Sequence, residues 1–335
     1  MFYNCFKEDV VKGTVELKKS EKKIKNKNKG KIIIAVTITC LFLLSAAAVS
    51  AAVVSARDKA NSAEEENLPV ETPDIVEVQP EAVQYYVAED QYNIDMTDLQ
   101  TEIENIISNT QAVAGGDWSV YIYIPFTGDT LSMNQKKMQA ASTIKLFIMG
   151  AVYENYDNLI SKYDESNLNT LIKDMITISS NESADELVTM LGGGNSSKGR
   201  KIVTEYCKSL GLENTSMGRM MSEDNVVSDN YTTTEDTAKF LEMVLNGDLP
   251  HSKEMVRVME KQERTSKIPA GIPKTVAFAN KTGELEDVEN DAAIIFSKYP
   301  YIICVMSDGV LDYQTPVDGI TKISNTVYNY LIPKM

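Results

Sequence analysis

The sequence predicts an α/β fold of the α+β type, in which a sheet is assembled from both ends of one domain and an all-helical lobe is inserted between them. Two observations predict it. Strand patterns occupy residues 118–124, continue in a second strand after the turn at 127–129, and return at 275–284, 290–297 and 301–307. In between, from residue 142 to residue 262, the apolar residues follow a helical period. Separate runs of strands and helices are typical of an α+β architecture.

The domain begins with an expected helix and two strands. Thr97 is the expected N-cap, and an apolar helical stripe follows it, made of Leu99, Ile103, Ile106 and Ile107. Residues 118–124 alternate in the manner of a half-buried strand. The turn Thr127-Gly128-Asp129 then leads into a second strand.

The inserted lobe and the closing helix come next. Clusters of Gly, Asn and Ser divide the helical block into segments at 142–155, 168–178, 182–191, 198–209, 234–246 and 252–262. After the last three strands, a helix over about 316–331 carries one apolar face, made of Ile320, Ile323, Val327 and Leu331. The predicted sheet lobe therefore covers about 97–140 and 265–335, and the predicted helical lobe about 141–264.

The N-terminal region has a different composition. Residues 1–31 hold ten lysines against four acidic residues, and residues 32–56 contain no charge. A run of this length can span a bilayer, and the lysines before it place the tail in the cytoplasm. We therefore expect a cytoplasmic basic tail, a single-pass anchor at 32–56, an acidic disordered stalk at 57–95 and an extracytoplasmic catalytic domain at 96–335. Cleavage of a signal peptide near the alanines of this segment, with secretion, is the alternative.

Charge and residue counts exclude several classes of function. The net charge is −15, and the part after the basic tail is more acidic still, which argues against nucleic-acid binding. His251 is the sole histidine, so a zinc centre and a Ser-His-Asp triad are not expected. Cys207 and Cys304 lie in apolar segments and are interpreted as packing residues, with a disulfide between them left open. We expect no cofactor, no metal and a monomer.

Ser142 and Lys145 form the first candidate for chemistry. They are three residues apart at the start of a predicted helix, so the hydroxyl and the amine lie on one face. A neutral lysine can activate a serine when burial or a nearby positive charge lowers its pKa. The spacing alone is weak evidence, because Ser20 and Lys23 share it inside the basic tail. A helix cap followed by a surface lysine would explain the pair equally well.

Two further motifs follow in order and change this interpretation. Ser179-Ser180-Asn181 lies at a junction between two predicted helices, and Lys281-Thr282-Gly283 ends a predicted strand. The trio resembles the active-site serine penicillin-recognising enzymes, that is, class A β-lactamases and their D,D-peptidase relatives. The resemblance covers about residues 97–333. It implies a β-lactamase/transpeptidase-like fold, with an antiparallel sheet flanked by helices.

The resemblance also implies roles for individual residues. Ser142 is the expected nucleophile and Lys145 takes or relays its proton. Ser179 passes a proton to the leaving nitrogen, and Asn181 binds the side-chain amide of the substrate. Lys281 and Thr282 of the third motif, which Gly283 completes, hold the substrate carboxylate. The backbone N–H groups of Ser142 and Glu284 form the expected oxyanion hole.

Two other segments match the amino-acid pattern of the second motif. Ser228-Asp229-Asn230 lies in a polar stretch that turn propensity explains, and Ser132-Met133-Asn134 precedes the nucleophile, inside a predicted strand. Ser179 has the helix-junction context that both lack. It is therefore the preferred second-motif serine.

The chain departs from class A β-lactamases between the second and third motifs. Those enzymes carry a Glu-x-x-Leu-Asn loop whose glutamate activates water, and residues 217–227 lack this pattern. Glu223 or Asp224 could substitute, and a solvated acidic loop is the competing interpretation. Two enzyme hypotheses follow: a β-lactamase that opens β-lactam amides, and a D,D-peptidase that acts on peptidoglycan stem peptides and deacylates slowly. A non-enzymatic penicillin sensor is the third.

Overall fold

The computed structural model describes residues 94–225 and 227–334. Their centre is a five-stranded sheet in the order β2-β1-β7-β6-β5, and every neighbouring pair is antiparallel. The strands are β1 (Gly115–Ile124), β2 (Asp129–Met133), β5 (Ala277–Leu285), β6 (Val288–Phe296) and β7 (Tyr301–Val310). Because β1 pairs with β7, the two ends of the domain meet in one sheet, as the strand patterns predict.

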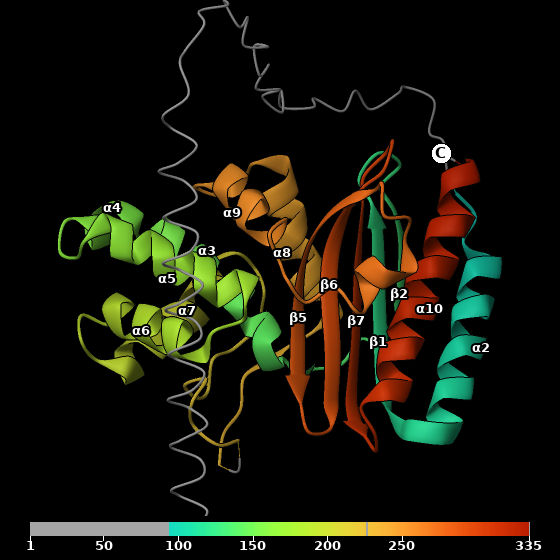
Figure 1. Ribbon diagram of the computed structural model, residues 1–335, viewed down its shortest axis with the longest axis horizontal. Helices are drawn as coiled ribbons and strands as arrows, with labels where there is room; N and C mark the ends of the chain where they lie inside the picture. The colour runs from blue at the N-terminus through green and yellow to red at the C-terminus, as the bar shows by residue number, and fades with distance from the viewer. Residues whose placement is uncertain (1–93, 226, 335) are drawn as a thin grey trace, which may run out of the picture. The chain divides into compact units, whose positions relative to one another are not determined.

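One face of the sheet is covered by the first and last long helices. These are α2 (Thr97–Ala114) and α10 (Gln314–Leu331), which lie side by side against the sheet (Figure 1). Leu99 and Ile103 of α2 and Ile320 and Ile323 of α10 are fully buried in the core that they share with the sheet. The predicted apolar stripes therefore face the strands. Their burial contributes roughly 1.5–3 kcal/mol per side chain.

The remaining helices lie on the opposite side of the sheet (Figure 1). They are α3 (Ile144–Glu154), α4 (Tyr156–Ile160), α5 (Glu165–Thr177), α6 (Asn181–Leu191), α7 (Ser196–Ser209), α8 (Thr234–Asn246) and α9 (Ser252–Met259). Short 3₁₀ turns occupy Ala141–Thr143, Ile268–Gly271 and Ile332–Lys334, and β3 (Met138–Gln139) pairs with β4 (Tyr231–Thr232). Helix α8 packs on β1, β6 and β7 and so joins the helical lobe to the sheet.

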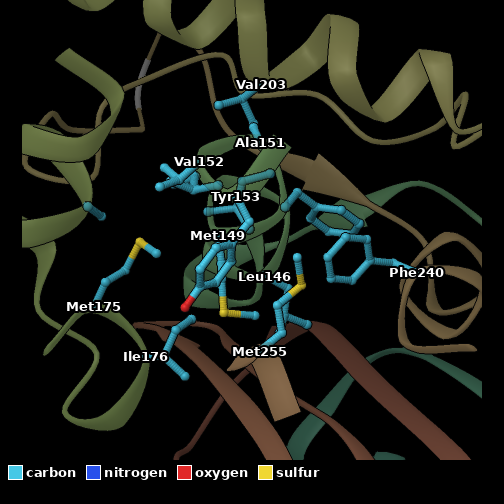
Figure 2. Close-up of a cluster of buried hydrophobic side chains, with 14 of the residues drawn as sticks. Leu146, Met149, Ala151, Val152, Tyr153, Met175, Ile176, Val203, Phe240 and Met255 are labelled. Carbon is cyan, nitrogen blue, oxygen red and sulfur yellow. The ribbon is translucent and has the colours of Figure 1, made fainter. Parts of the chain in front are cut away.

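Helix α3 runs through the middle of the helical lobe. All its residues from Ile144 to Tyr153 are buried. Figure 2 shows Leu146 and Met149 of this helix among side chains from other helices, including Met175, Phe240 and Met255. A helix that is apolar on all sides is stable only when it is enclosed. Packing therefore holds α3 on every side, and α3 carries the first motif at its N-terminus.

Element boundaries differ from the prediction by a few residues. The expected N-cap, Thr97, is the first residue of α2, and its N–H and hydroxyl both donate to the Asp95 carboxylate. The predicted helix 142–155 begins with the 3₁₀ turn and becomes α-helical at Ile144. The N-cap of α2 is Met96, and the Asp95 carboxylate just before it bonds to the first helical residue. Periodicity does not resolve boundaries to one or two residues.

The predicted tail, anchor and most of the stalk, residues 1–93, lie outside the described residues. Within the described ranges, none of the helices combines the length and apolarity needed to cross a bilayer. The anchor predicted at 32–56 remains a prediction.

Candidate active site

The turn that carries Ser142 is held in a strained conformation. Ala141, just before it, has φ of +47°, a left-handed value that is costly for a residue with a Cβ. The Thr143 hydroxyl donates to Ala140 O at 2.6 Å, and Ala140 N donates to Asn230 O at 2.8 Å. The Asn290 side-chain amide donates to Gln139 O at 2.9 Å and to Ala140 O at 3.2 Å. Neighbouring elements therefore fix the turn on two sides.

Lys145 lies one helical turn after Ser142 and is fully buried. Four oxygen atoms lie within hydrogen-bond distance of its Nζ: Ser142 Oγ at 3.1 Å, Ser179 O at 2.7 Å, Ser179 Oγ at 3.2 Å and Asn181 Oδ1 at 2.7 Å. Burial, and then the positive charge of Arg264, lowers the pKa of Lys145 from 10.5 to about 7. A substantial fraction of Lys145 is therefore neutral near pH 7 and able to accept a proton.

Ser179 lies between the two motif lysines. It follows α5, has φ of +62°, and precedes Ser180, whose hydroxyl caps α6 by accepting from Ser183 N at 3.0 Å. This backbone turn directs Ser179 Oγ towards Lys145 at 3.2 Å and Lys281 at 2.9 Å. A hydroxyl with an amine on each side can pass a proton from one to the other.

The third motif forms part of strand β5, beside the Ser142 turn. Lys281 is fully buried and also donates to Thr282 O at 2.8 Å. Burial, and then the charge of Lys145, lowers the pKa of Lys281 well below its ordinary value. A Cβ on Gly283 would lie 2.8 Å from Ala140 O and 3.1 Å from Ser142 N. Only glycine permits this close approach of β5 to the Ser142 turn.

A pocket of about 220 Å³ opens beside Ser142. It is lined by Ala141, Ser142, Asn181, Arg219, Met221, Glu223, Asp224, Asn225, Glu284 and Leu285. The structure thus brings together the predicted residues of all three motifs and both predicted oxyanion residues. The lining residues within 219–225 come from the loop between α7 and β4, which we call the loop wall.

The loop wall is built around one buried ion pair. Arg219 Nε lies 2.7 Å from Asp229 Oδ1, and both side chains are almost fully buried. The Arg219 guanidinium also donates to Met220 O, Met221 O and Glu223 O. From α6, the Asp185 carboxylate accepts from Met221 N at 2.6 Å and Ser222 N at 3.0 Å. Charge-assisted bonds to backbone groups therefore shape this loop.

Glu223 lines the pocket, and the loop itself holds its carboxylate. Glu223 Oε2 accepts from Met220 N at 2.9 Å and lies 3.8 Å from Arg200 Nη1. The side chain is 54% exposed. Met221, by contrast, is 8% exposed and presents an apolar side chain to the same pocket. The partners of the Glu223 carboxylate are thus Met220 of the loop and Arg200 of α7.

The two other segments that match the second motif lie elsewhere. Ser132 is on β2, opposite Tyr121 of β1. Ser228 belongs to the loop, where the adjacent Asp229 pairs with Arg219 and Asn230 accepts from Arg219 N at 3.1 Å. This segment is therefore more than a polar turn, because its two buried side chains anchor the loop wall.

The other residues considered in the sequence analysis, His251 and the two cysteines, are packed against neighbouring side chains. His251 stacks on Tyr153, with ring centroids 5.0 Å apart, and packs at a tilt against Tyr156, with ring centroids 4.8 Å apart. Cys207 and Cys304 are buried and free. Among residues 94–225 and 227–334 there is no group of three or more His, Cys, Asp or Glu side chains that could hold a metal ion.

Several residues of the site belong to none of the three sequence motifs. Arg219 shapes the loop, Asp185 anchors it, and Arg264 donates to Glu284 Oε2 at 2.7 Å beside the motif lysines. No spacing rule singles them out, because each reaches the site from a different part of the chain.

The model of the β-lactamase enzyme family matches this chain over residues 98–166 and 160–331. Among solved structures, PBP-A is 22% identical, covering 71% of this chain and 97% of its own, with a TM-score of 0.61. A β-lactamase from Sphaerobacter thermophilus is 22% identical over 70% of this chain and 97% of its own, with a TM-score of 0.60. One from Xanthomonas campestris is 18% identical over 70% and 98%, with a TM-score of 0.61.

None of the curated proteins matches the chain. At these identities, the solved structures establish the fold, and they confirm the predicted β-lactamase/transpeptidase-like architecture. The family model spans the whole domain that holds Ser142, Lys145 and Lys281. The chain therefore belongs to the β-lactamase enzyme family and is a serine hydrolase that acts on amide bonds.

Proposed function

We propose that Ser142 attacks the carbonyl of a β-lactam ring and becomes acylated, with Lys145 as the general base. The observation that carries this proposal is the fully buried amine of Lys145, 3.1 Å from Ser142 Oγ, with its pKa lowered to about 7. A base of this pKa loses its own proton near neutral pH and can then accept that of a hydroxyl.

The other motif residues complete the step. The backbone N–H groups of Ser142 and Glu284 stabilise the oxyanion, a contribution of roughly 3–4 kcal/mol per donor in comparable sites. Ser179, between Lys145 and Lys281, delivers a proton to the leaving nitrogen. Lys281 and Thr282 hold the substrate carboxylate, whose negative charge favours the protonated form of Lys281. Asn181 binds the side-chain amide of the substrate.

The loop wall favours slow release of the acyl group, and with it a second candidate function. Glu223, the loop carboxylate considered as a water-activating base, is bonded to Met220 N and lies close to Arg200. Without a well-placed base, the water that hydrolyses an acyl-enzyme is not activated, so the acyl-enzyme breaks down slowly. This behaviour fits a D,D-peptidase that acts on peptidoglycan stem peptides and is inhibited by β-lactams. Its first half-reaction is the same as that of a β-lactamase.

Two assays test these functions on one preparation. A fluorescent penicillin should label the chain stoichiometrically, and Ser142→Ala should abolish labelling. Persistent labelling of Ser142→Ala would remove Ser142 as the nucleophile. Turnover of a chromogenic cephalosporin then separates the candidates, because fast turnover supports the β-lactamase and a long-lived label with undetectable turnover supports the D,D-peptidase.

We also propose that the catalytic domain is extracytoplasmic and tethered by residues 32–56. The support is the charge-free run with lysines before it. Cleavage of the segment, with secretion, is the alternative. Protease added outside spheroplasts should digest the domain and leave a membrane-bound N-terminal fragment. Protection of the domain would contradict the export, and recovery of a shortened chain in the medium would support cleavage.

A further inference from the structure

Lys267 is a fully buried lysine that belongs to none of the three motifs. It precedes the 3₁₀ turn Ile268–Gly271, and its Nζ reaches strands β5 and β6. The amine lies 2.6 Å from Glu289 Oε2 and 3.3 Å from Glu284 Oε1. It also donates to the backbone carbonyls of Gly283 at 3.3 Å and Asn290 at 3.1 Å.

The bond to Gly283 O acts on the peptide unit that the oxyanion hole uses. The carbonyl of Gly283 and the N–H of Glu284 belong to the same peptide, and in a trans peptide they point in opposite directions. Lys267 therefore binds the carbonyl from the side opposite to that on which the Glu284 N–H points. A cation bonded to a carbonyl polarises the peptide and makes its N–H a stronger donor.

The bond to Asn290 O acts on the other half of the hole. Asn290 pairs with Gly283 across the β5–β6 hairpin. Its side-chain amide donates to Gln139 O and Ala140 O, just before Ser142. Lys267 thus bonds to the backbone of Asn290, whose side chain fixes the turn that contains Ser142. One amine is connected to both predicted donors, the N–H groups of Ser142 and Glu284.

A purely structural role accounts for only part of this arrangement. A buried ion pair with Glu289 would satisfy the charge of Lys267, and an apolar pair of similar volume is often equally stable. The two additional bonds are to carbonyls of the two strands that contact the Ser142 turn. This geometry suits a residue that orients and polarises the hole.

We propose that Lys267 is a positioning residue of the oxyanion hole: through Gly283 O it orients and strengthens the Glu284 N–H donor, and through Asn290 it fixes the Ser142 turn. The proposal rests on the proposed acylation of Ser142. Lys267 does not touch the substrate. Its effect should therefore lie in the acylation step and in the bonding of the acyl carbonyl, and not in the initial binding of the β-lactam.

The test uses the full-length chain and a variant that removes the charge without leaving an unpaired buried carboxylate, Lys267→Met/Glu289→Gln. We expect acylation by a fluorescent penicillin to slow by about tenfold, less than the 10²–10³-fold loss typical of a deleted donor, with the dissociation constant of the non-covalent complex unchanged. The infrared band of the acyl-ester carbonyl should move to higher wavenumber, because its hydrogen bonds weaken. Lys267→Arg should recover most of the rate.

Three comparisons make the result decisive. Lys274→Met, which removes an exposed lysine from the same segment, should acylate at the unchanged rate. Glu289→Gln alone keeps the amine and weakens its strongest partner, so the carbonyl band should move to lower wavenumber; this variant decides the question if the double variant does not fold. An acylation rate equal to that of the unchanged chain and an unshifted carbonyl band in both Lys267→Met/Glu289→Gln and Glu289→Gln would overturn the role of Lys267. Failure of the unchanged chain to be labelled would contradict the proposed function itself.

Discussion

The two walls of the Ser142 pocket are built in different ways. On one side, α3 and β5 bring buried lysines to the nucleophile, and the backbone of β5 approaches Ser142 N so closely that only Gly283 fits. On the other side, the loop around Arg219 presents Met221 and a largely exposed Glu223. The first wall contains the groups that acylation needs. In the second, the Glu223 carboxylate is bonded to Met220 N and lies close to Arg200 of α7, which supports the proposal that formation and breakdown of an acyl-enzyme depend on separate parts of this chain.

The largest effect is expected at Lys145, in the wall of the pocket that α3 and β5 form. Lys145→Met removes the base and keeps an apolar side chain of similar length inside α3. Because general-base catalysis contributes about 10²–10⁴-fold, the rate constant for acylation by a penicillin should fall by about 10³-fold. Stopped-flow labelling measures it, and Lys162→Met, at an exposed position, is the matched control. A loss below tenfold would mean that another group takes the proton.

The next effect concerns the stability of the loop wall. Arg219→Met breaks a buried ion pair and leaves Asp229 unpaired, so it should lower the free energy of unfolding by about 3–5 kcal/mol. Urea denaturation measures it. Lys201→Met, which breaks the exposed Lys201–Glu205 pair, should cost about 0.5 kcal/mol or less. If acylation of the folded Arg219→Met variant fell as far as in Lys145→Met, the separation of the two walls would be contradicted.

The pH dependence of acylation tests the first wall without a mutation. The base must be neutral, and the pKa of Lys145 is lowered to about 7, so the neutral form is lost as the pH falls through 7. Acylation should therefore slow by about tenfold per pH unit below 7 and level off above it. An apparent pKa near 10, the ordinary value for lysine, would show that burial does not tune this amine.

The smallest effect is expected at Glu223. Glu223→Gln should leave acylation unchanged and alter the lifetime of the acyl-enzyme by less than about threefold, because the carboxylate is held by Met220 N and Arg200. Mass spectrometry of the acylated chain over time measures the lifetime, with Asp224→Asn as the parallel variant. A lifetime prolonged by about tenfold or more would identify Glu223 as the base that activates water.

The parts of this molecule that follow periodic patterns were predictable. The strands from both ends of the domain, the stripes of α2 and α10, and the order of the three motifs all follow from local sequence. The conformations at the site do not. Ala141 and Ser179 have left-handed backbones without being glycine, and surrounding contacts impose them. Arg219 and Lys267 were missed because their importance depends on partners distant in the chain, such as the carbonyls of Gly283 and Asn290.

The lifetime of the Ser142 acyl-enzyme tests the central claim most directly. The full-length chain is acylated with excess penicillin, the free antibiotic is removed, and the loss of the acyl mass is followed by mass spectrometry. We expect rapid and stoichiometric acylation followed by slow decay, on the order of minutes or longer, because the Glu223 carboxylate is bonded to Met220 N and lies close to Arg200. Decay within a second, with the β-lactam turned over many times, would contradict the division between the two walls.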